Sequence, residues 1–402
     1  MQKSVILLLL FFQLQFVSAQ RIEILIKGGH VIDPKSKIDG ILDVAISNGK
    51  ILRIANGIDA KNANQVIDAK GMYVVPGLID IHTHVFYGPD PERHFCNGPE
   101  SVLPDAFTFH SGVTTAVDAG SSGWKDFPVF KKKIIDSSKT RILAFLNIVG
   151  AGMRGHAYEQ DTNDMEGEKT ALVAKQFSKY IVGIKVAHYK GSVWKPVDEA
   201  KKAGNIANIP LMIDFGDNPT PLSLKELFLK HMRPGDIFTH CFAELKGREY
   251  IVDTVTNKLK PFVWEARQRG IIFDLGYGVI SFSFSQALPA IKSGFYPNSI
   301  STDMHADRNN KMKDILDIMS EFLALGMNIH EVIGTVTWNP AREIKHEELG
   351  NITEGAIADI AILKIRNYSI GFYDHDGHKI NGTKRFVCVM TIKSGQTVYH
   401  LN

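Results

Sequence analysis

Eight short apolar segments follow one another through the middle of the chain, at intervals of about 25 to 40 residues. Amphipathic helical stretches, such as residues 168–180 and 314–325, separate most of them. Strands that alternate with helices pair in parallel, so eight such units predict a (β/α)8 (TIM) barrel, an α/β fold of about 250 residues. A doubly wound α/β sheet is the alternative, because the same alternation also builds it. The eight segments are residues 77–81, 113–117, 142–148, 182–186, 210–213, 236–239, 271–275 and 298–302.

Both ends of the chain have a different pattern. Apolar residues alternate with polar ones between residues 22 and 75, with turn residues such as Asn48-Gly49 between the alternating stretches, and residues 357–363 and 386–398 are similar. This alternation predicts short antiparallel strands. We expect the two ends, residues 20–76 and 346–402, to form one small β-sandwich domain, with the barrel between them at 77–345.

The first 19 residues have the three-part pattern of a cleavable secretory signal. Lys3 precedes an apolar block at residues 5–12, and Val17-Ser18-Ala19 ends the segment with small residues. A buried helix or a membrane anchor is the alternative, but the block is shorter than the roughly 20 residues that a membrane span needs. We therefore predict export to the periplasm or the medium, a mature chain that begins near Gln20, and no membrane anchor.

Composition narrows the range of partners. A formal net charge of +3 on 402 residues gives no reason to expect nucleic acid or an anionic membrane as a partner. The three cysteines, Cys96, Cys241 and Cys388, are too few and too far apart for a disulfide scaffold or a zinc knuckle. The fold must therefore depend on a large core, and the sequence is compatible with a monomer or a homo-oligomer.

Residues that can bind metal follow several of the apolar segments, at the point where each predicted strand ends. The first segment ends in His82-Thr83-His84, whose imidazoles face the same side because strand side chains repeat every two residues. Four other segments are followed by Lys185, Asp214, His240 and Asp303. Catalytic residues of a TIM barrel lie at the C-terminal strand ends, so these side chains are predicted to converge. The structural alternatives are a solvated lysine, a helix-capping aspartate and hydrogen-bonded buried histidines.

The residues around His82 and His84 resemble a known family. The segment Val75-Pro76-Gly77-Leu78-Ile79-Asp80-Ile81-His82-Thr83-His84 resembles the first-strand signature of the amidohydrolase superfamily, and residues 338–342 and 355–360 are similar to its late signatures. Residues 183–185, 239–241 and 300–305 are similar to its dihydroorotase-like deacetylase branch. The resemblance extends from about Ile22 to the C-terminus.

The resemblance implies a binuclear centre with two divalent metal ions, expected to be zinc. His82 and His84 would bind the buried metal, Lys185 would bridge both metals after N6-carboxylation, and Asp303 would bind the first metal and transfer the proton. The fifth- and sixth-strand residues, Asp214 and His240, would hold the second metal. The fifth strand of the family usually ends in His, so Asp214 is a departure: it is either a carboxylate ligand or a sign that one metal has been lost.

For the substrate, three residues are candidates. Arg154 follows the third segment in a glycine-rich stretch and could clamp a carboxylate, Glu159 lies nearby, and Tyr277 could donate a hydrogen bond to a carbonyl. For each of these three residues, the alternative to substrate binding is a purely structural role. We expect hydrolysis of an amide or ester bond, and specifically a deacetylase acting on a small N- or O-acylated compound. A dihydroorotase-like cyclic amidase is the enzymatic alternative, and a metal-free binding scaffold is the alternative of a different class.

Overall fold

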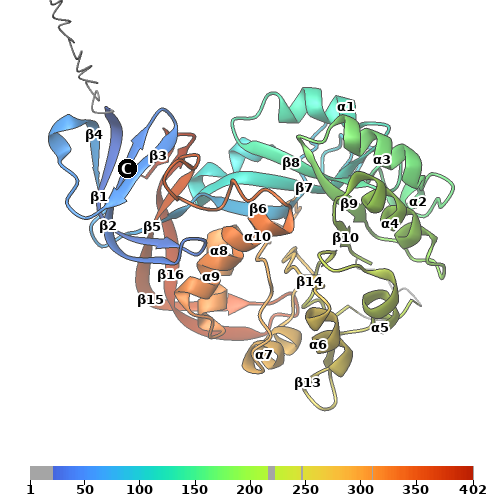
Figure 1. The fold of residues 1–402 in the computed structure, drawn as a ribbon. Coiled ribbons are helices and arrows are strands. Elements are labelled where there is room, and N and C mark those ends of the chain that lie inside the picture. Colours follow the sequence, from blue (N-terminus) through green and yellow to red (C-terminus); the bar gives the residue numbers. More distant parts are fainter. Residues whose placement is uncertain (1–20, 216–221, 246–247, 310, 402) are drawn as a thin grey trace, which may run out of the picture.

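A curled sheet of seven parallel strands forms the centre of the computed structural model (Figure 1), which describes residues 21–401 except 216–221, 246–247 and 310. The predicted signal at residues 1–19 lies outside the described residues. The strands lie in the order β14-β11-β10-β9-β8-β7-β6, so neighbours in the sheet follow one another along the chain. A doubly wound sheet would reverse direction at a switch point, and this order excludes it. The strands are β6 (Leu78–Thr83), β7 (Val113–Gly123), β8 (Arg141–Asn147), β9 (Ile181–Val186), β10 (Leu211–Ile213), β11 (Ile237–Phe238) and β14 (Ile272–Phe273).

The eighth predicted segment joins the two edges of this sheet. Ser299 forms a parallel bridge with Asp274, which follows β14, and Met304 forms one with Thr83 at the end of β6. The amide of His84 also donates to the carbonyl of Met304 at 2.8 Å. The segment therefore closes the sheet into a TIM-like barrel, although it pairs through single bridges and not as the continuous strand predicted at 298–302.

Both ends of the chain contribute to a second, eight-stranded sheet. Its order is β17-β16-β15-β5-β1-β2-β3, and β4 pairs with β1. Strand β5 connects the N-terminal and C-terminal strands of this sheet, because it pairs in parallel with β1 and antiparallel with β15. The C-terminus therefore lies beside the N-terminal strands (Figure 1). That this sheet forms a separate sandwich domain with the expected boundaries stays a prediction. The strands are β1 (Ile22–Asp33), β2 (Ile38–Ser47), β3 (Lys50–Ala55), β4 (Ala63–Asp68), β5 (Tyr73–Pro76), β15 (Ile360–Tyr373), β16 (Lys379–Lys393) and β17 (Gln396–His400).

Helices α1, α3 and α4 cover the outer side of strands β7 to β10 (Figure 1). The predicted helix at 314–325 is confirmed as α8, which begins where the Asp314 side chain accepts the amide of Asp317. The one predicted at 168–180 ends earlier, as α3, because Phe177 leaves the helical conformation and leads into β9. The helices are α1 (Phe127–Phe130), α2 (His156–Glu159), α3 (Gly167–Gln176), α4 (Lys195–Ala207), α5 (Leu224–Glu226), α6 (Pro261–Gln268), α7 (Phe284–Lys292), α8 (Ile315–Ala324), α9 (Ile329–Thr335) and α10 (Trp338–Glu343).

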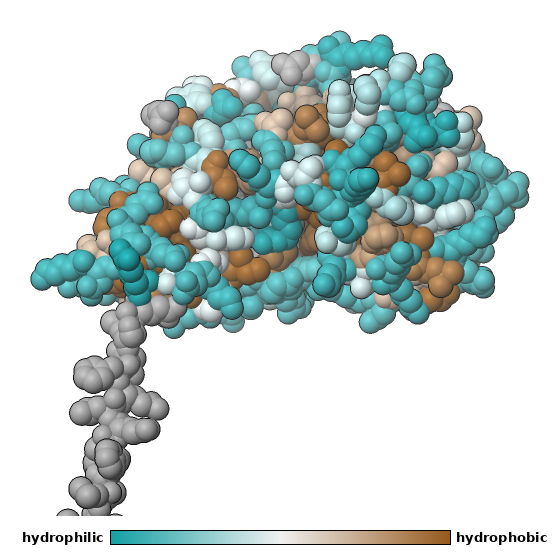
Figure 2. All heavy atoms as spheres, turned by 90° about the horizontal axis from the view of Figure 1, so that it is seen from above, coloured by the Kyte–Doolittle hydropathy of each residue, from teal (hydrophilic) through white to brown (hydrophobic). Residues whose placement is uncertain are grey.

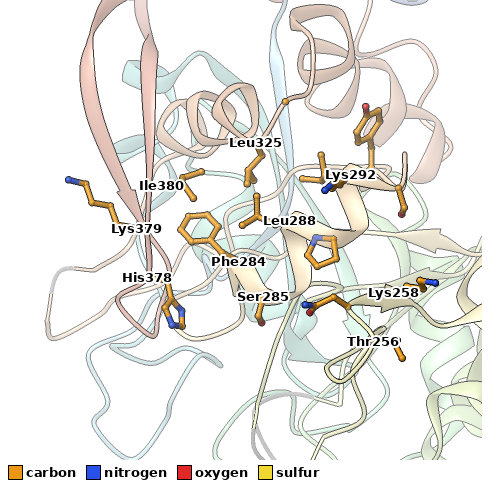
Figure 3. Close-up of a pocket in the computed structure, with 16 residues that line it drawn as sticks. Thr256, Lys258, Phe284, Ser285, Leu288, Lys292, Leu325, His378, Lys379 and Ile380 are labelled. Atoms are coloured by element: carbon orange, nitrogen blue, oxygen red, sulfur yellow. The ribbon is translucent and has the colours of Figure 1, made fainter.

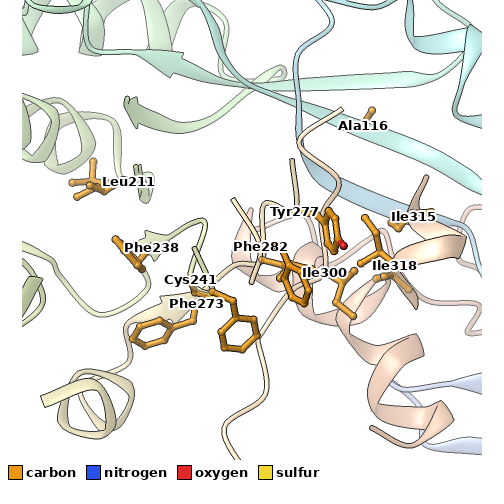
Figure 4. Close-up of a cluster of buried hydrophobic side chains, with 14 of the residues drawn as sticks. Ala116, Leu211, Phe238, Cys241, Phe273, Tyr277, Phe282, Ile300, Ile315 and Ile318 are labelled. Carbon is orange, nitrogen blue, oxygen red and sulfur yellow. The ribbon is translucent and has the colours of Figure 1, made fainter. Parts of the chain in front are cut away.

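A large apolar core lies between the barrel strands and these helices. Figure 4 shows part of it, with Phe238 and Phe273 on one side and Tyr277 and Phe282 on the other. The rings of Phe238 and Phe273 pack edge to face at 6.3 Å, a favourable geometry for buried aromatic pairs. All three cysteines are buried and unpaired, as the prediction of a core without disulfides requires.

The surface seen in Figure 2 is mainly hydrophilic, with separate small hydrophobic patches. Among the helices of the described residues, none has the length and apolar character that crossing a membrane would require.

Candidate metal centre

The six predicted ligand residues line one cavity of ≈ 240 Å³ at the C-terminal ends of the barrel strands. They come from strands or strand ends that are far apart in the sequence, and the barrel brings them together because all its strands point the same way. The six are His82, His84, Lys185, Asp214, His240 and Asp303.

The first group of donor atoms surrounds the Asp303 carboxylate. Its Oδ1 lies 3.4 Å from His82 Nε2 and 3.2 Å from His84 Nε2. Donor atoms of His82, His240 and Asp303 all lie within 4.8 Å of one another, so one ion can contact all three after small movements. Burial alone would raise the pKa of Asp303, but His82, His84 and His305 hold it well below its usual range, so the carboxylate is an anionic donor.

Contacts with Nδ1 orient the imidazole rings of His82 and His240. Thr239 Oγ1 lies 2.8 Å from His82 Nδ1 and donates its own proton to Asp274, so His82 Nδ1 is the donor and Nε2 keeps its lone pair. His240 Nδ1 donates to the carbonyl of Gly276 at 2.6 Å, which orients Nε2 toward Asp214. Burial and the charge of Lys185 lower the pKa of His82 to about 3, so it is neutral. Neutral imidazoles fixed through Nδ1 are typical of metal-binding histidines.

Lys185 is completely buried in this group. Its Nζ lies 3.3 Å from His82 Nε2, and burial lowers its pKa. Gly120 makes room for it, because a Cβ on that glycine would lie 2.6 Å from Lys185 Cβ. A buried lysine among neutral imidazoles and carboxylates is not the solvated strand-end residue of the structural alternative.

A second group of donor atoms surrounds the Asp214 carboxylate. Its Oδ2 lies 3.3 Å from His240 Nε2 and 3.8 Å from His188 Nε2, and His188 Nδ1 lies 2.6 Å from Glu159 Oε2. Burial would raise the pKa of Asp214, but its contacts with His240, Lys185 and His188 hold it well below its usual range. Burial would likewise lower the pKa of His188, but Glu159 and Asp214 raise it to about 9. This end of the cavity therefore favours a positive charge.

Backbone conformation places several of these side chains. His188, His240 and Asp303 have φ of 57°, 55° and 54°, in the left-handed region that side chains other than glycine rarely adopt. Such residues cost about 1–3 kcal/mol each and cluster at functional sites. Gly278, with φ +57°, packs directly on this group: a Cβ there would lie 2.6 Å from Asp303 Oδ2.

The structure does not bring all the predicted substrate residues to the cavity. Glu159 lines it and contacts His188. Tyr277 points away: its hydroxyl lies 3.2 Å from a carboxylate oxygen of Glu321, which corrects its prediction as a donor to the substrate carbonyl. The Arg154 guanidinium lies over the ring of Tyr158 at 4.7 Å and is outside the cavity lining, so the prediction of a carboxylate clamp there is not supported either.

Other cavity residues were missed by the sequence analysis. His188 comes three residues after Lys185, and His305 comes two after Asp303, with its Nδ1 2.6 Å from the Asp303 carbonyl. Their closeness to predicted ligands was the available signal. Asp274, which follows β14 and accepts a hydrogen bond from the Thr239 hydroxyl, is not part of the cavity lining.

A larger hollow of ≈ 1080 Å³ lies away from this centre (Figure 3). Its lining includes Phe284, Leu288, Leu325 and Ile380, and no aspartate or glutamate is among its described lining residues. It offers none of the clustered donors of the smaller cavity, which is therefore the candidate active site.

Comparison with known proteins is consistent with this geometry. The sequence pattern of the amidohydrolase family matches residues 280–398. The chain is 32% identical to a deacetylase of Agrobacterium fabrum over 339 residues, which make up 82% of this chain and 80% of the relative. A solved adenine deaminase aligns with a TM-score of 0.83 and 27% identity, over 94% of this chain and 100% of its own. A solved dihydroorotase aligns with a TM-score of 0.81 and 27% identity, over 94% of this chain and 99% of its own.

Proposed function

The chain belongs to the amidohydrolase family, and from this membership we propose that it is a deacetylase, which removes a small acyl group from an N- or O-acylated compound. It is a metal-dependent hydrolase that acts on C–N bonds. The observation that carries the proposal is the convergence on one cavity of the six side chains predicted to bind metal. The similarity to a deacetylase over most of both chains favours acyl transfer to water as the reaction.

The donor set fits two divalent metal ions. His82, His84 and Asp303 would hold one ion, and Asp214 and His240 would hold the other. Imidazole and carboxylate donors suit zinc, which we propose as the metal. When bound, the two ions polarise the acyl carbonyl and lower the pKa of water, so that a nucleophile is available near neutral pH.

Lys185 would bridge the two positions as a carbamate. Burial lowers the pKa of Lys185 and so favours loss of its proton. The neutral amine then has a lone pair that can attack the carbon of carbon dioxide. As the N–C bond forms, one C=O π bond of carbon dioxide opens and its electron pair moves to oxygen, while the nitrogen loses one proton to water; the product is an N6-carboxylate. The product is an anionic oxygen donor, whereas an ammonium group has no lone pair to offer a metal.

Asp303 is the proposed proton carrier. It is ionised and faces both His82 and His84, so it can accept a proton from the attacking water and pass it to the leaving group. His305 holds its backbone carbonyl at 2.6 Å and so limits its movement. Phe95 stacks on His84 at 4.3 Å and excludes water from one side of the group.

The cavity volume favours a small substrate. Pockets for drug-sized ligands are about 300–1,000 Å³, and this cavity measures ≈ 240 Å³. Hydrolysis of a small cyclic amide is the second candidate, because the fold also matches that of a dihydroorotase. We propose no nucleic-acid or membrane partner.

The location of the reaction is also a proposal. The signal-like pattern at residues 1–19 supports export, with a mature chain that begins near Gln20. N-terminal sequencing of the protein secreted by its native host tests this, since a chain that still carries Met1 would contradict cleavage.

Metal analysis combined with a substrate screen tests the proposed reaction. The purified protein should contain two equivalents of divalent metal. It should release acetate from at least one member of a panel of small N-acetyl and O-acetyl compounds, and it should open cyclic amides more slowly. Faster opening of a cyclic amide would favour the second candidate, and a protein without metal or hydrolytic activity would refute both.

A further inference from the structure

His188 belongs to none of the ligand positions described so far, yet it lines the same cavity. We infer that His188 binds the second metal ion together with Asp214 and His240; the inference rests on the proposed metal-dependent function. Its imidazole would supply the second nitrogen donor at this position.

The position of His188 supports this role. Its Nε2 lies 3.8 Å from Asp214 Oδ2, the same oxygen that lies 3.3 Å from His240 Nε2. The carboxylate is therefore shared by two imidazoles that approach it from different strands, β9 and β11. A cation that binds this oxygen is within a short movement of both nitrogens.

The orientation of the ring supports it as well. Glu159, which is buried at 2% exposure, holds His188 Nδ1 at 2.6 Å. A carboxylate behind one ring nitrogen fixes the proton there and directs the other nitrogen forward as a donor. Here the forward nitrogen faces Asp214.

The backbone singles out the same residue. His188 shares its left-handed φ with His240 and Asp303, the two other non-glycine residues of the cavity lining with positive φ. A surface histidine gains nothing from this conformation, which costs about 1–3 kcal/mol. In His240 and Asp303 it directs a donor atom into the cavity, and His188 follows the same pattern.

The chemistry of the donor set gives the reason for a third ligand. Without His188, the second position has Asp214, His240 and the bridging lysine, with only one neutral nitrogen donor. Adding His188 gives two imidazoles and a carboxylate, a combination that binds zinc in many enzymes. Asp214 and Glu159 place two carboxylates around the ring, so the position stabilises a cation.

The alternative is that His188 is an imidazolium that only bridges Glu159 and Asp214. Metal binding distinguishes the two roles. Protein stripped by a chelator would be titrated with Co²⁺, and the bound equivalents would be measured by mass spectrometry of the metal and by the visible absorption of the cobalt ion. Wild type should bind two equivalents.

His188→Ala should bind one equivalent with unchanged affinity and the second at least about tenfold more weakly, with a changed absorption spectrum. Glu159→Gln should weaken the same equivalent without removing it. Asp214→His in the His188→Ala background should restore the second equivalent, because an imidazole at the end of β10 supplies the missing nitrogen. His94→Ala is the matched control: His94 lines the rim of the same cavity, and both equivalents should be retained.

Two outcomes separate this inference from the proposed function. Wild type that binds no metal would refute the metal-dependent function and this inference with it. Wild type and His188→Ala that both bind two equivalents with equal affinity and the same spectrum would refute only the role of His188. Retention of the first equivalent with unchanged affinity shows that the His188→Ala chain folds.

Discussion

Replacing Glu343 with glutamine should stabilise the protein, and by an amount that increases with pH. Glu343 ends α10 and is buried, and its Oε2 has no hydrogen-bond partner among the described residues. Burial and the nearby negative charge of Asp274 raise its pKa from 4.5 to about 8, although Ser299 and Arg342 act in the opposite direction. The folded protein therefore keeps Glu343 protonated at neutral pH, whereas the unfolded chain ionises it.

The sign and size of the effect follow from the two pKa values. A raised carboxyl pKa gives a contribution to the free energy of unfolding that is complete below pH 4.5 and is lost as the pH rises toward 8. The loss is about 3 kcal/mol at pH 7 and below about 1 kcal/mol at pH 5. Glutamine has nearly the same shape but does not titrate, so Glu343→Gln should avoid this loss. With an unfolding entropy of about 0.8 kcal/mol/K for a chain of this size, Tm should rise by about 4 °C at pH 7 and about 1 °C at pH 5.

Differential scanning calorimetry of both proteins between pH 5 and pH 8 measures this. Glu347→Gln, which changes an exposed glutamate four residues past the end of α10, is the control and should shift Tm by less than about 1 °C at every pH. A Glu343→Gln shift that is equal at pH 5 and pH 8, or that decreases with pH, would show that Glu343 is ionised in the folded state and would refute the reasoning.

Three further predictions concern the cavity. Asp303→Asn should lower kcat by at least about 100-fold, measured by steady-state kinetics, while its metal content falls less than its activity. A variant with near-normal turnover and full metal content would show that Asp303 does not transfer the proton. Gly278→Ala should lower kcat because its Cβ would lie 2.6 Å from Asp303 Oδ2. Gly28→Ala is the control: it has a similar positive φ of +65° but nothing within 4 Å of the new Cβ, so it should lose similar stability and keep its kcat unchanged. Equal kcat values for the two variants would contradict the contact. Removing metal with a chelator should abolish activity and lower Tm, because Asp214 and Asp303 then lose the cations that they bind, and added Zn²⁺ should restore both activity and Tm. Activity that persists when the protein retains less than about 0.1 equivalent of metal would argue against a metal-dependent reaction.

Local sequence patterns were enough to predict seven of the barrel strands and the residues at their ends. A strand repeats every two residues and a helix about every 3.6, so the apolar segments revealed the α/β alternation without any long-range information. Side chains at the ends of parallel strands must meet at one end of a barrel. For this reason His82, His84 and Lys185 could be assigned to one cavity before any contact was known.

Only the tertiary structure decided which way the residues beyond the strands point. Tyr277 lies between two glycines with φ of +50° and +57°, and this backbone turns its hydroxyl toward Glu321 and away from the cavity. The pairing of His188 with Glu159, 29 residues apart, depends in the same way on a left-handed turn after β9. Periodicity predicts side-chain direction only inside regular elements; past the last strand residue the direction depends on individual dihedral angles and on contacts between distant segments, which no local pattern encodes.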